Sequence, residues 1–176
     1  MFTHPENNLR AFGIHENMIV ADLGAGTGFY SIIAGRMAQR GKVYAIEVQK
    51  DFLDTIKSKI REAHLSNIEV IWGDIEKIGG TKLGENVVDR VIVSNVFFQV
   101  EDKVGLIKEV KRILKPGGKI LLIDHCPSRS QLSIGNFISE EKVIEFFELG
   151  GFSLERKIDA GEHHYGIIFI NKSEKF

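Results

Sequence analysis

A cluster of glycines follows the first apolar run of the chain, and its spacing suits contact with a ligand. Gly24, Gly26 and Gly28 have no Cβ, so bound atoms can approach the bare backbone of the turn closely. A helical pattern starts at Phe29, which places the turn at the positive end of a helix dipole, where a nucleotide-like cofactor binds well. The alternative is a tight strand-to-helix turn that binds nothing, which three glycines within five residues disfavour.

The spacing of these glycines indicates which cofactor the turn would bind. Dinucleotide-binding folds use Gly-x-Gly-x-x-Gly, and Phe29 stands where that pattern needs its third glycine. Residues 22–28, Asp-Leu-Gly-Ala-Gly-Thr-Gly, instead resemble the first motif of the class I (Rossmann-like) S-adenosylmethionine-dependent methyltransferases. The resemblance implies S-adenosylmethionine as cofactor and S-adenosylhomocysteine as product. It assigns to the cofactor site the motif residues Asp22, Gly24, Ala25, Gly26 and Gly28.

Further segments match the same family in type and order. They are residues 44–47 (Tyr-Ala-Ile-Glu), 73–74 (Gly-Asp), 89–95 (Asp-Arg-Val-Ile-Val-Ser-Asn) and 114–118 (Leu-Lys-Pro-Gly-Gly). Within the family, the chain looks most like the compact methyltransferases of ubiquinone synthesis, which act on small molecules. The resemblance therefore implies methyl transfer to a small-molecule acceptor.

Other cofactor contacts are expected at strand ends, because ligands of open α/β sheets bind beyond the carboxyl ends of the strands. Glu47 ends the second expected strand, and its carboxylate can accept hydrogen bonds from both ribose hydroxyls. Dinucleotide folds carry an acid at the same place, so Glu47 indicates a nucleoside without choosing the cofactor. The alternative is a solvated strand end.

The end of the third expected strand supplies the adenine contacts that the resemblance implies. Asp74 faces the adenine amine, the backbone amide that follows it meets a ring nitrogen, and Val48 covers the adenine face. The alternative for Asp74 is an aspartate that caps its own loop. Gly73, Ile75 and Asn95 complete the expected cofactor set.

Strand and helix patterns alternate along the chain and predict an α/β fold. Strands are expected at residues 19–23, 42–47, 68–72, 87–96, 119–124, 152–158 and 165–171, and helices at 7–12, 29–40, 51–64, 104–114 and 139–149. Residues 73–86 show no apolar period, so this crossover is expected to be mostly loop. The last two strands are joined too closely for a crossover helix and must form an antiparallel hairpin. The final strand is apolar on both faces, so it should lie centrally.

These features predict a three-layer Rossmann-like methyltransferase fold. Its mostly parallel seven-stranded sheet has the family order 3-2-1-4-5-7-6, with the last strand antiparallel. We expect one methyltransferase domain over residues 1–176, divided into a short N-terminal segment (1–18), a cofactor-binding core (19–124) and a C-terminal helix and hairpin (125–176).

Composition limits the partners and the compartment. The 24 acidic and 23 basic residues nearly balance, which argues against strong binding to nucleic acid or to an anionic membrane. The basic run Lys108, Lys111, Arg112 and Lys115 is expected on a solvated helix face. No apolar run is long enough for a membrane span, and the start lacks signal-peptide features. A single cysteine, Cys126, agrees with a reducing compartment, so we expect a cytoplasmic protein.

Methyl transfer is an in-line displacement in which the leaving group needs no acid, so positioning supplies much of the rate. The acceptor-side candidates are Asn95, Phe98, Gln99, Asp124, His125, His163, His164 and Tyr165. We expect a shallow, partly aromatic site for a flat or apolar acceptor, with a neutral histidine to accept its proton. Such a site either takes an exposed group of a larger substrate or is completed by a second subunit in a homodimer.

Other functions fit the sequence less well or remain open. His163 and His164 are adjacent rather than at the spacing of a zinc pair, and no metal site is predicted. A nicotinamide-dependent oxidoreductase would need the other glycine spacing, and no tyrosine here begins the Tyr-x-x-x-Lys pattern of its short-chain type. Residues 95–98, Asn-Val-Phe-Phe, lack the prolines of methyltransferases that modify nucleobase amines. A non-catalytic S-adenosylmethionine-binding or scaffold protein fits the same motifs.

Overall fold

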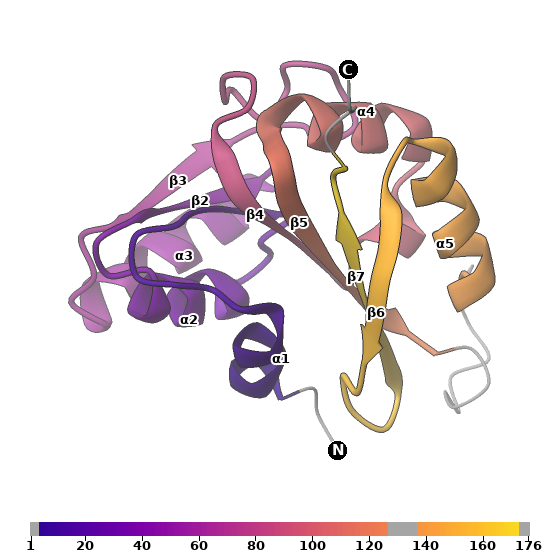
Figure 1. Cartoon of the computed structure of the whole chain (residues 1–176). Coiled ribbons are helices and arrows are strands. Elements are labelled where there is room, and N and C mark those ends of the chain that lie inside the picture. The colour runs from indigo at the N-terminus through magenta and orange to yellow at the C-terminus, as the bar shows by residue number, and fades with distance from the viewer. Residues whose placement is uncertain (1–3, 127–136, 173–176) are drawn as a thin grey trace.

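The computed structural model describes residues 4–126 and 137–172, and its centre is one seven-stranded sheet (Figure 1). The strands are β1 (Ile19–Leu23), β2 (Lys42–Glu47), β3 (Ile68–Trp72), β4 (Val88–Ser94), β5 (Leu114–His125), β6 (Ser153–Ile158) and β7 (His164–Ile170). Their order is β3-β2-β1-β4-β5-β7-β6, and β7 is antiparallel to both of its neighbours. The predicted fold class and strand order are confirmed.

Helices cover both faces of this sheet (Figure 1). They are α1 (Pro5–Phe12), α2 (Phe29–Met37) and α3 (Lys50–Glu62) on one side and α4 (Lys103–Ile113) and α5 (Glu140–Leu149) on the other, with a short 3-10 helix, η1 (Phe97–Gln99), after β4. Leu9 and Phe12 of α1 join the core on the α2 side. Phe147 of α5 stacks on Phe169 of β7 in the other core, with ring centroids 4.5 Å apart.

The burial of the last two strands explains their order. Ile167, Ile168 and Phe169 of β7 are buried, as a strand covered on both faces requires, whereas most of β6 is exposed. β7 therefore lies between β5 and β6, and the hairpin is the antiparallel one that its short connection demands.

The two largest shifts in strand boundaries from the expectation have physical reasons. β4 ends at Ser94 because Asn95 adopts a positive φ of 55°, which breaks the extended strand. β5 begins at Leu114, which pairs with Val88 before an irregularity in the register. Residues 115–118, which separate the expected helix at 104–114 from the expected strand at 119–124, thus lie inside β5, where Gly117 has a φ of 75° and its N–H donates to the Asn171 carbonyl.

No helix forms in the crossover between β3 and β4, as predicted, and a buried acid of α4 holds that loop in place. The Glu109 side chain is fully buried, and it accepts hydrogen bonds from the Gly79 N–H (2.8 Å) and the Thr81 hydroxyl (2.5 Å). Arg112 donates to the Glu109 carboxylate (2.7 Å) and to the Leu83 carbonyl (2.8 Å). Three of these hydrogen bonds hold the loop against α4, and the fourth joins Arg112 to Glu109 within α4.

The expectation of a solvated basic face on α4 is therefore wrong for part of the run. Arg112 lies in the buried network just described, since its fixed planar donors match a carboxylate and a carbonyl together. Lys111 donates to Asn171 Oδ1 (2.6 Å), and Lys115 pairs with Asp89 (2.8 Å). Helical spacing places these residues on one face but does not say whether strands and loops cover that face.

Candidate cofactor and acceptor site

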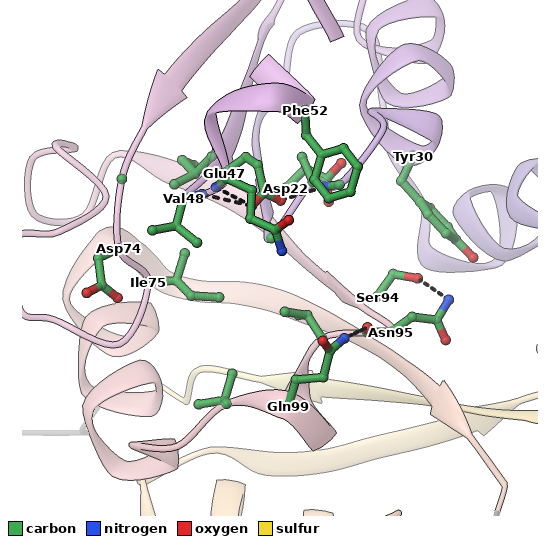
Figure 2. Close-up of a pocket in the computed structure, with 18 of the residues that line it drawn as sticks. Asp22, Tyr30, Glu47, Val48, Phe52, Asp74, Ile75, Ser94, Asn95 and Gln99 are labelled. Carbon is green, nitrogen blue, oxygen red and sulfur yellow. Dashed lines mark hydrogen bonds between the residues drawn. The ribbon is translucent and has the colours of Figure 1, made fainter. Parts of the chain in front are cut away.

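A cavity of about 560 Å³ opens at the carboxyl ends of β1 to β4, where the strand order reverses. Figure 2 shows its walls, with Val48 and Asp74 at one end, Tyr30 and Asn95 at the other, and Glu47 and Asp22 between them. All the predicted cofactor residues except Gly28 line it: Asp22, Gly24, Ala25, Gly26, Glu47, Val48, Gly73, Asp74, Ile75 and Asn95. The structure thus brings the separate motifs together.

The three glycines of the turn serve different purposes. A Cβ at Gly24 would lie 2.7 Å from Val96, and one at Gly28 would lie 3.0 Å from Ile56, so both positions allow close packing of the turn. A Cβ at Gly26 would meet no protein atom within 4 Å, although Gly26 lines the cavity. Gly26 therefore keeps the cavity floor bare for a ligand, whereas Gly28 caps α2 outside the cavity.

Glu47 organises the backbone around the cavity. Its Oε2 accepts a hydrogen bond from the Gly26 N–H (2.8 Å), and its Oε1 accepts from the N–H groups of Val48 and Gln49 (2.9 Å each). Only 5% of Glu47 is exposed. The carboxylate thus links the glycine turn to the end of β2 in the wall of the cavity, and its Oε2 can accept one further hydrogen bond, as the predicted ribose contact requires.

We expect Glu47→Gln to weaken S-adenosylmethionine binding by about 1.5–3 kcal/mol, because the amide accepts weaker hydrogen bonds than the carboxylate and presents donors to the Gly26 N–H. Isothermal titration calorimetry measures the change. Glu69→Gln is the matched control, since Glu69 is an acid of the adjacent strand that pairs with Lys42 outside the cavity. Equal affinities in parent and Glu47→Gln would remove the ribose assignment.

Asp22 is the most deeply buried acid of the cavity wall. Burial raises the pKa of Asp22 to about 6, and the negative charge of Glu47 adds to the increase. Hydrogen bonds from Ser31, whose hydroxyl donates to Asp22 Oδ2 (2.5 Å), act in the opposite direction. Asp74 is nearer the solvent, and the Lys77 ammonium, 2.9 Å from Asp74 Oδ2, holds the pKa of Asp74 below its ordinary value. Asp74 is therefore ionised at neutral pH.

The charge of the lining favours a cationic ligand. Four acids line the cavity, Asp22, Glu47, Asp74 and Glu76, and none of the described lining residues is lysine or arginine. S-adenosylmethionine carries a sulfonium and an ammonium group, which such a wall attracts, whereas the pyrophosphate of a dinucleotide would be repelled. The electrostatics therefore support the cofactor that the glycine spacing indicates.

Asn95 offers a further test of this fit. Its Oδ1 is buried without a hydrogen-bond partner among the described residues, while its Nδ2 lies 3.4 Å from the Ser94 hydroxyl. Its backbone φ of 55° is rare for a residue with a side chain, and its carbonyl accepts a hydrogen bond from Gln99 Nε2 (3.0 Å). An unpaired buried acceptor at an acid-lined cavity suits an ammonium donor, so the residues present fit S-adenosylmethionine.

We expect the affinity for S-adenosylmethionine to rise with pH up to about pH 6, by up to about tenfold per unit, and then to level off. The sign follows from charge: a bound cation favours ionised Asp22, so binding below pH 6 must release its proton. Calorimetry between pH 5 and 7 in Asp22→Asn should show a flatter dependence. Asp124→Asn is the control, because burial also raises the Asp124 pKa to about 6 but Asp124 does not line the cavity. An unchanged slope in Asp22→Asn would contradict the assignment.

Beside this cavity lies a second, aromatic hollow. It is lined by Phe98, Gln99, Val100, Glu101, Lys103, Phe137 and Ile138. Gln99 and Val100 also line the cofactor cavity, so the two spaces adjoin. The rings of Phe98 and Phe137 contact each other and the His125 ring, with centroids about 6 Å apart. Of the acceptor-side candidates, Phe98 and Gln99 thus line the hollow, and His125 contacts its phenylalanine rings.

Two buried polar side chains position these rings. Asp124 accepts hydrogen bonds from the N–H of His125 (2.9 Å) and from the N–H of Phe98 (3.0 Å), which fixes the end of β5 against η1. The Tyr165 hydroxyl donates to the Ile138 carbonyl (3.0 Å), and burial raises its pKa. Tyr165 lines neither the cavity nor the aromatic hollow. His163 lies in the hairpin, where its carbonyl accepts from the Cys126 N–H.

Sequence reasoning missed several residues of the site. Phe29, Tyr30 and Phe52 line the cavity from the first turns of α2 and α3, and Phe137 joins the hollow from beyond β5. The position of Phe29 directly after the glycine turn could have predicted its place at the cavity. Its side chain is 57% exposed and is not part of the core. Asn8 donates to the Tyr30 hydroxyl (3.1 Å), but no described residue before β1 lines the cavity.

Among residues 4–126 and 137–172, no three metal-binding side chains come together, and the expectation of no metal stays a prediction. No helix of the same residues is long and apolar enough to cross a membrane.

Comparison with known proteins identifies the family. A family model described as "Methyltransferase domain" matches residues 14–157. A demethylmenaquinone methyltransferase of Geobacillus sp. (strain WCH70) is 26% identical over 120 residues, which are 68% of this chain and 50% of that protein. The chain thus spans about half the length of the curated relatives that it matches.

Solved structures agree on the fold. A SAM dependent methyltransferase from Aquifex aeolicus is 29% identical, with a TM-score of 0.86 over 96% of this chain and 90% of that chain. The cyclase SpnF, 13% identical, covers 90% of this chain and 76% of its own with a TM-score of 0.78 and shares the fold alone. The family model covers most of the chain, and the glycine turn and the acidic strand ends of the chain meet at one cavity. The chain therefore belongs to the class I S-adenosylmethionine-dependent methyltransferases.

Proposed function

We propose that this protein transfers the methyl group of S-adenosylmethionine to a small, flat, ring-containing acceptor in the aromatic hollow. One observation carries the proposal: an acid-lined cavity suited to the cofactor adjoins a hollow walled by phenylalanine rings, and Gln99 and Val100 belong to both. The acceptor would then meet the methyl group of the cofactor where the cavity and the hollow adjoin.

The residues of the chain would do their work mainly by positioning. Glu47 and Asp74 hold the nucleoside end, and Asp22 and Asn95 hold the cationic end of the cofactor, which supplies an activated methyl group when bound. Phe98 and Phe137 offer ring surfaces against which a flat acceptor can pack, and they keep water from it. In-line displacement needs this alignment more than it needs an acid, because the leaving thioether is neutral.

The relatives suggest the first acceptor to test. Curated relatives are named demethylmenaquinone methyltransferases, so a ring system of that kind is a reasonable acceptor for this chain also. The near balance of acidic and basic residues supports a small-molecule acceptor over a nucleic acid. A single cysteine supports a cytoplasmic location. We also propose a homodimer in which the second subunit completes the open acceptor side.

The experiment incubates the full chain with methyl-labelled S-adenosylmethionine and 1,4-dihydroxynaphthalene, a flat hydroxyaromatic ring, under anaerobic conditions. We expect label in the ring product, and Phe98→Ala should lower kcat/KM at least about tenfold with cofactor affinity unchanged. Trp72→Ala is the control, because Trp72 is an exposed aromatic outside both spaces. Tight cofactor binding without label transfer to this ring or to any fraction of a cell extract would instead support the non-catalytic binder.

A further inference from the structure

Two histidine rings from neighbouring strands lie against each other beside the aromatic hollow. His125, the last residue of β5, pairs in register with His164, the first residue of β7, and their ring centroids are 4.3 Å apart at an interplanar angle of 37°. The other side of the His125 ring meets Phe98 at 78° and Phe137 at 67°, so both phenylalanines approach it edge to face. The His125 ring thus packs directly against the two phenylalanine rings that line the hollow.

The backbone around this pair is held firmly. Asp124 binds the N–H groups of His125 and Phe98 with its two oxygens, so the imidazole and the phenylalanine ring keep a fixed relation. His164 Nδ1 is buried and has no hydrogen-bond partner among the described residues. His164 therefore contributes a ring surface to His125 rather than a hydrogen-bonded bridge.

The charges that surround His125 favour its neutral form. Burial first and the charge of His163 second hold the pKa of His125 below its ordinary value. Burial, His125 and His163 lower the pKa of His164 to about 4. The titratable and charged groups around the pair are His163 of the hairpin, Asp124 at the end of β5, and the groups that line one hollow with His164, namely Glu140, Lys157, Asp159 and Tyr165. Because its pKa lies below the ordinary value of a histidine, the His125 ring is neutral near pH 7.

We infer that His125 is the proton acceptor of the methyl-transfer step and takes the hydroxyl proton of a hydroxyaromatic acceptor in the aromatic hollow. This inference rests on the proposed function, whose acceptor occupies that hollow. Asp124 and His164 are positioning residues: the first fixes the backbone of His125, and the second supports its ring.

The step balances in atoms and charge. The acceptor hydroxyl gives its proton to an imidazole nitrogen of His125, and the electron pair left on the acceptor forms the new bond to the methyl carbon. The carbon–sulfur bond breaks at the same time, and its electron pair stays on sulfur. One positive charge is lost at sulfur and one appears on His125, whose proton then passes to solvent.

The test uses 4-nitrophenol, whose visible absorption changes when it ionises, with the full chain saturated by S-adenosylhomocysteine so that no transfer occurs. We expect the bound phenol to ionise about one pH unit lower than the free phenol, because an imidazolium forms beside it. Proton NMR of the His125 ring should show that imidazolium on binding. His125→Phe keeps the ring contacts and should lose both signals, whereas His15→Phe, at an exposed histidine between α1 and β1 that does not line the hollow, should keep them.

A second variant separates proton transfer from simple packing. His163→Gln removes a charge that lowers the pKa of His125, so the NMR midpoint of His125 should move upward and the bound phenol should ionise at a lower pH, because a more basic imidazole takes its proton more readily. The inference is overturned if 4-nitrophenol shows no saturable binding, or if it ionises alike in the parent and in His125→Phe. Failure of the proposed function appears elsewhere, as a parent protein that does not bind S-adenosylmethionine or forms no labelled product.

Discussion

Gly26→Val should abolish the binding of S-adenosylmethionine while the protein remains folded. A Cβ at this position would meet no protein atom within 4 Å, so the valine side chain can only project into the cavity that Gly26 lines. There it would occupy the floor on which the cofactor has to lie. We expect an affinity loss of at least about a hundredfold, or about 2.8 kcal/mol, in isothermal titration calorimetry.

Backbone strain needs its own control, because Gly26 has a φ of 53° and valine tolerates such a value poorly. Gly117→Val supplies it: Gly117 has a φ of 75°, and its added Cβ also meets nothing within 4 Å, yet it lies far from the cavity in β5. Both variants should lose about 1–3 kcal/mol of stability, but only Gly26→Val should lose the cofactor. Retained cofactor affinity in Gly26→Val would mean that the ligand lies elsewhere.

The cofactor side of this site was predictable because its residues lie in or beside short sequence motifs. Each one lies at the end of a strand whose apolar pattern is plain or shortly after it, and parallel strands bring their carboxyl ends to one edge of the sheet. The position of Glu47 and Asp74 in the cavity lining follows from that rule alone. The three hydrogen bonds that Glu47 receives from backbone N–H groups were not predictable, since they depend on how the turn closes around it.

The acceptor side was harder because its residues meet only through tertiary structure. Phe98, His125 and His164 come from η1, β5 and β7, and their contact depends on the register in which β7 pairs with β5. The sequence predicted that β7 lies beside β5 from its two apolar faces, but apolar faces do not fix which residues stand opposite each other. Phe137 follows no strand, so no pattern indicated its place at the hollow.

The burial of Glu109, a charged residue inside a helix, was also not predictable from the sequence. Its position in α4 resembles that of any surface acid, and only the loop that packs over it reveals the burial. Helix periodicity cannot predict that cover, because residues 79–83 have no pattern of their own. The basic residue three positions later was assigned to a solvated face for the same reason, although Arg112 is the partner of this acid.

Glu109→Ala should destabilise the protein by about 3–5 kcal/mol, the largest stability loss that we expect from a single substitution. The change leaves Arg112 and the N–H groups of Gly79 and Thr81 without the carboxylate that pairs them, and a buried charge without its partner is strongly unfavourable. Urea unfolding measures the loss. Glu145→Ala on α5 is the matched control, because that acid is exposed and should change stability by less than about 0.5 kcal/mol.

The pH dependence identifies the group responsible. Burial would raise the pKa of Glu109, but its hydrogen bonds from Arg112, Thr81 and Gly79 together lower it from 4.5 to about 2. A lowered folded-state pKa means that the contribution of Glu109 is complete above about pH 4.5 and is lost as the pH falls toward 2. The stability difference between the parent and Glu109→Ala should therefore shrink across this range. A difference that stays constant from pH 6 to pH 3 would show that lost packing, rather than the ionised carboxylate, explains the effect.

The double variant Glu109→Leu with Arg112→Leu separates the charge pair from the space that it fills. Replacing both partners removes the uncompensated cation and supplies apolar volume, so this protein should be more stable than Glu109→Ala. The loop at residues 73–86, which carries Asp74 and Ile75, would still lose the bonds to Gly79 and Thr81. We therefore expect the double variant to recover stability yet bind S-adenosylmethionine more weakly than the parent in calorimetry. Parent-like affinity in the double variant would show that the buried carboxylate supports folding without shaping the cofactor cavity.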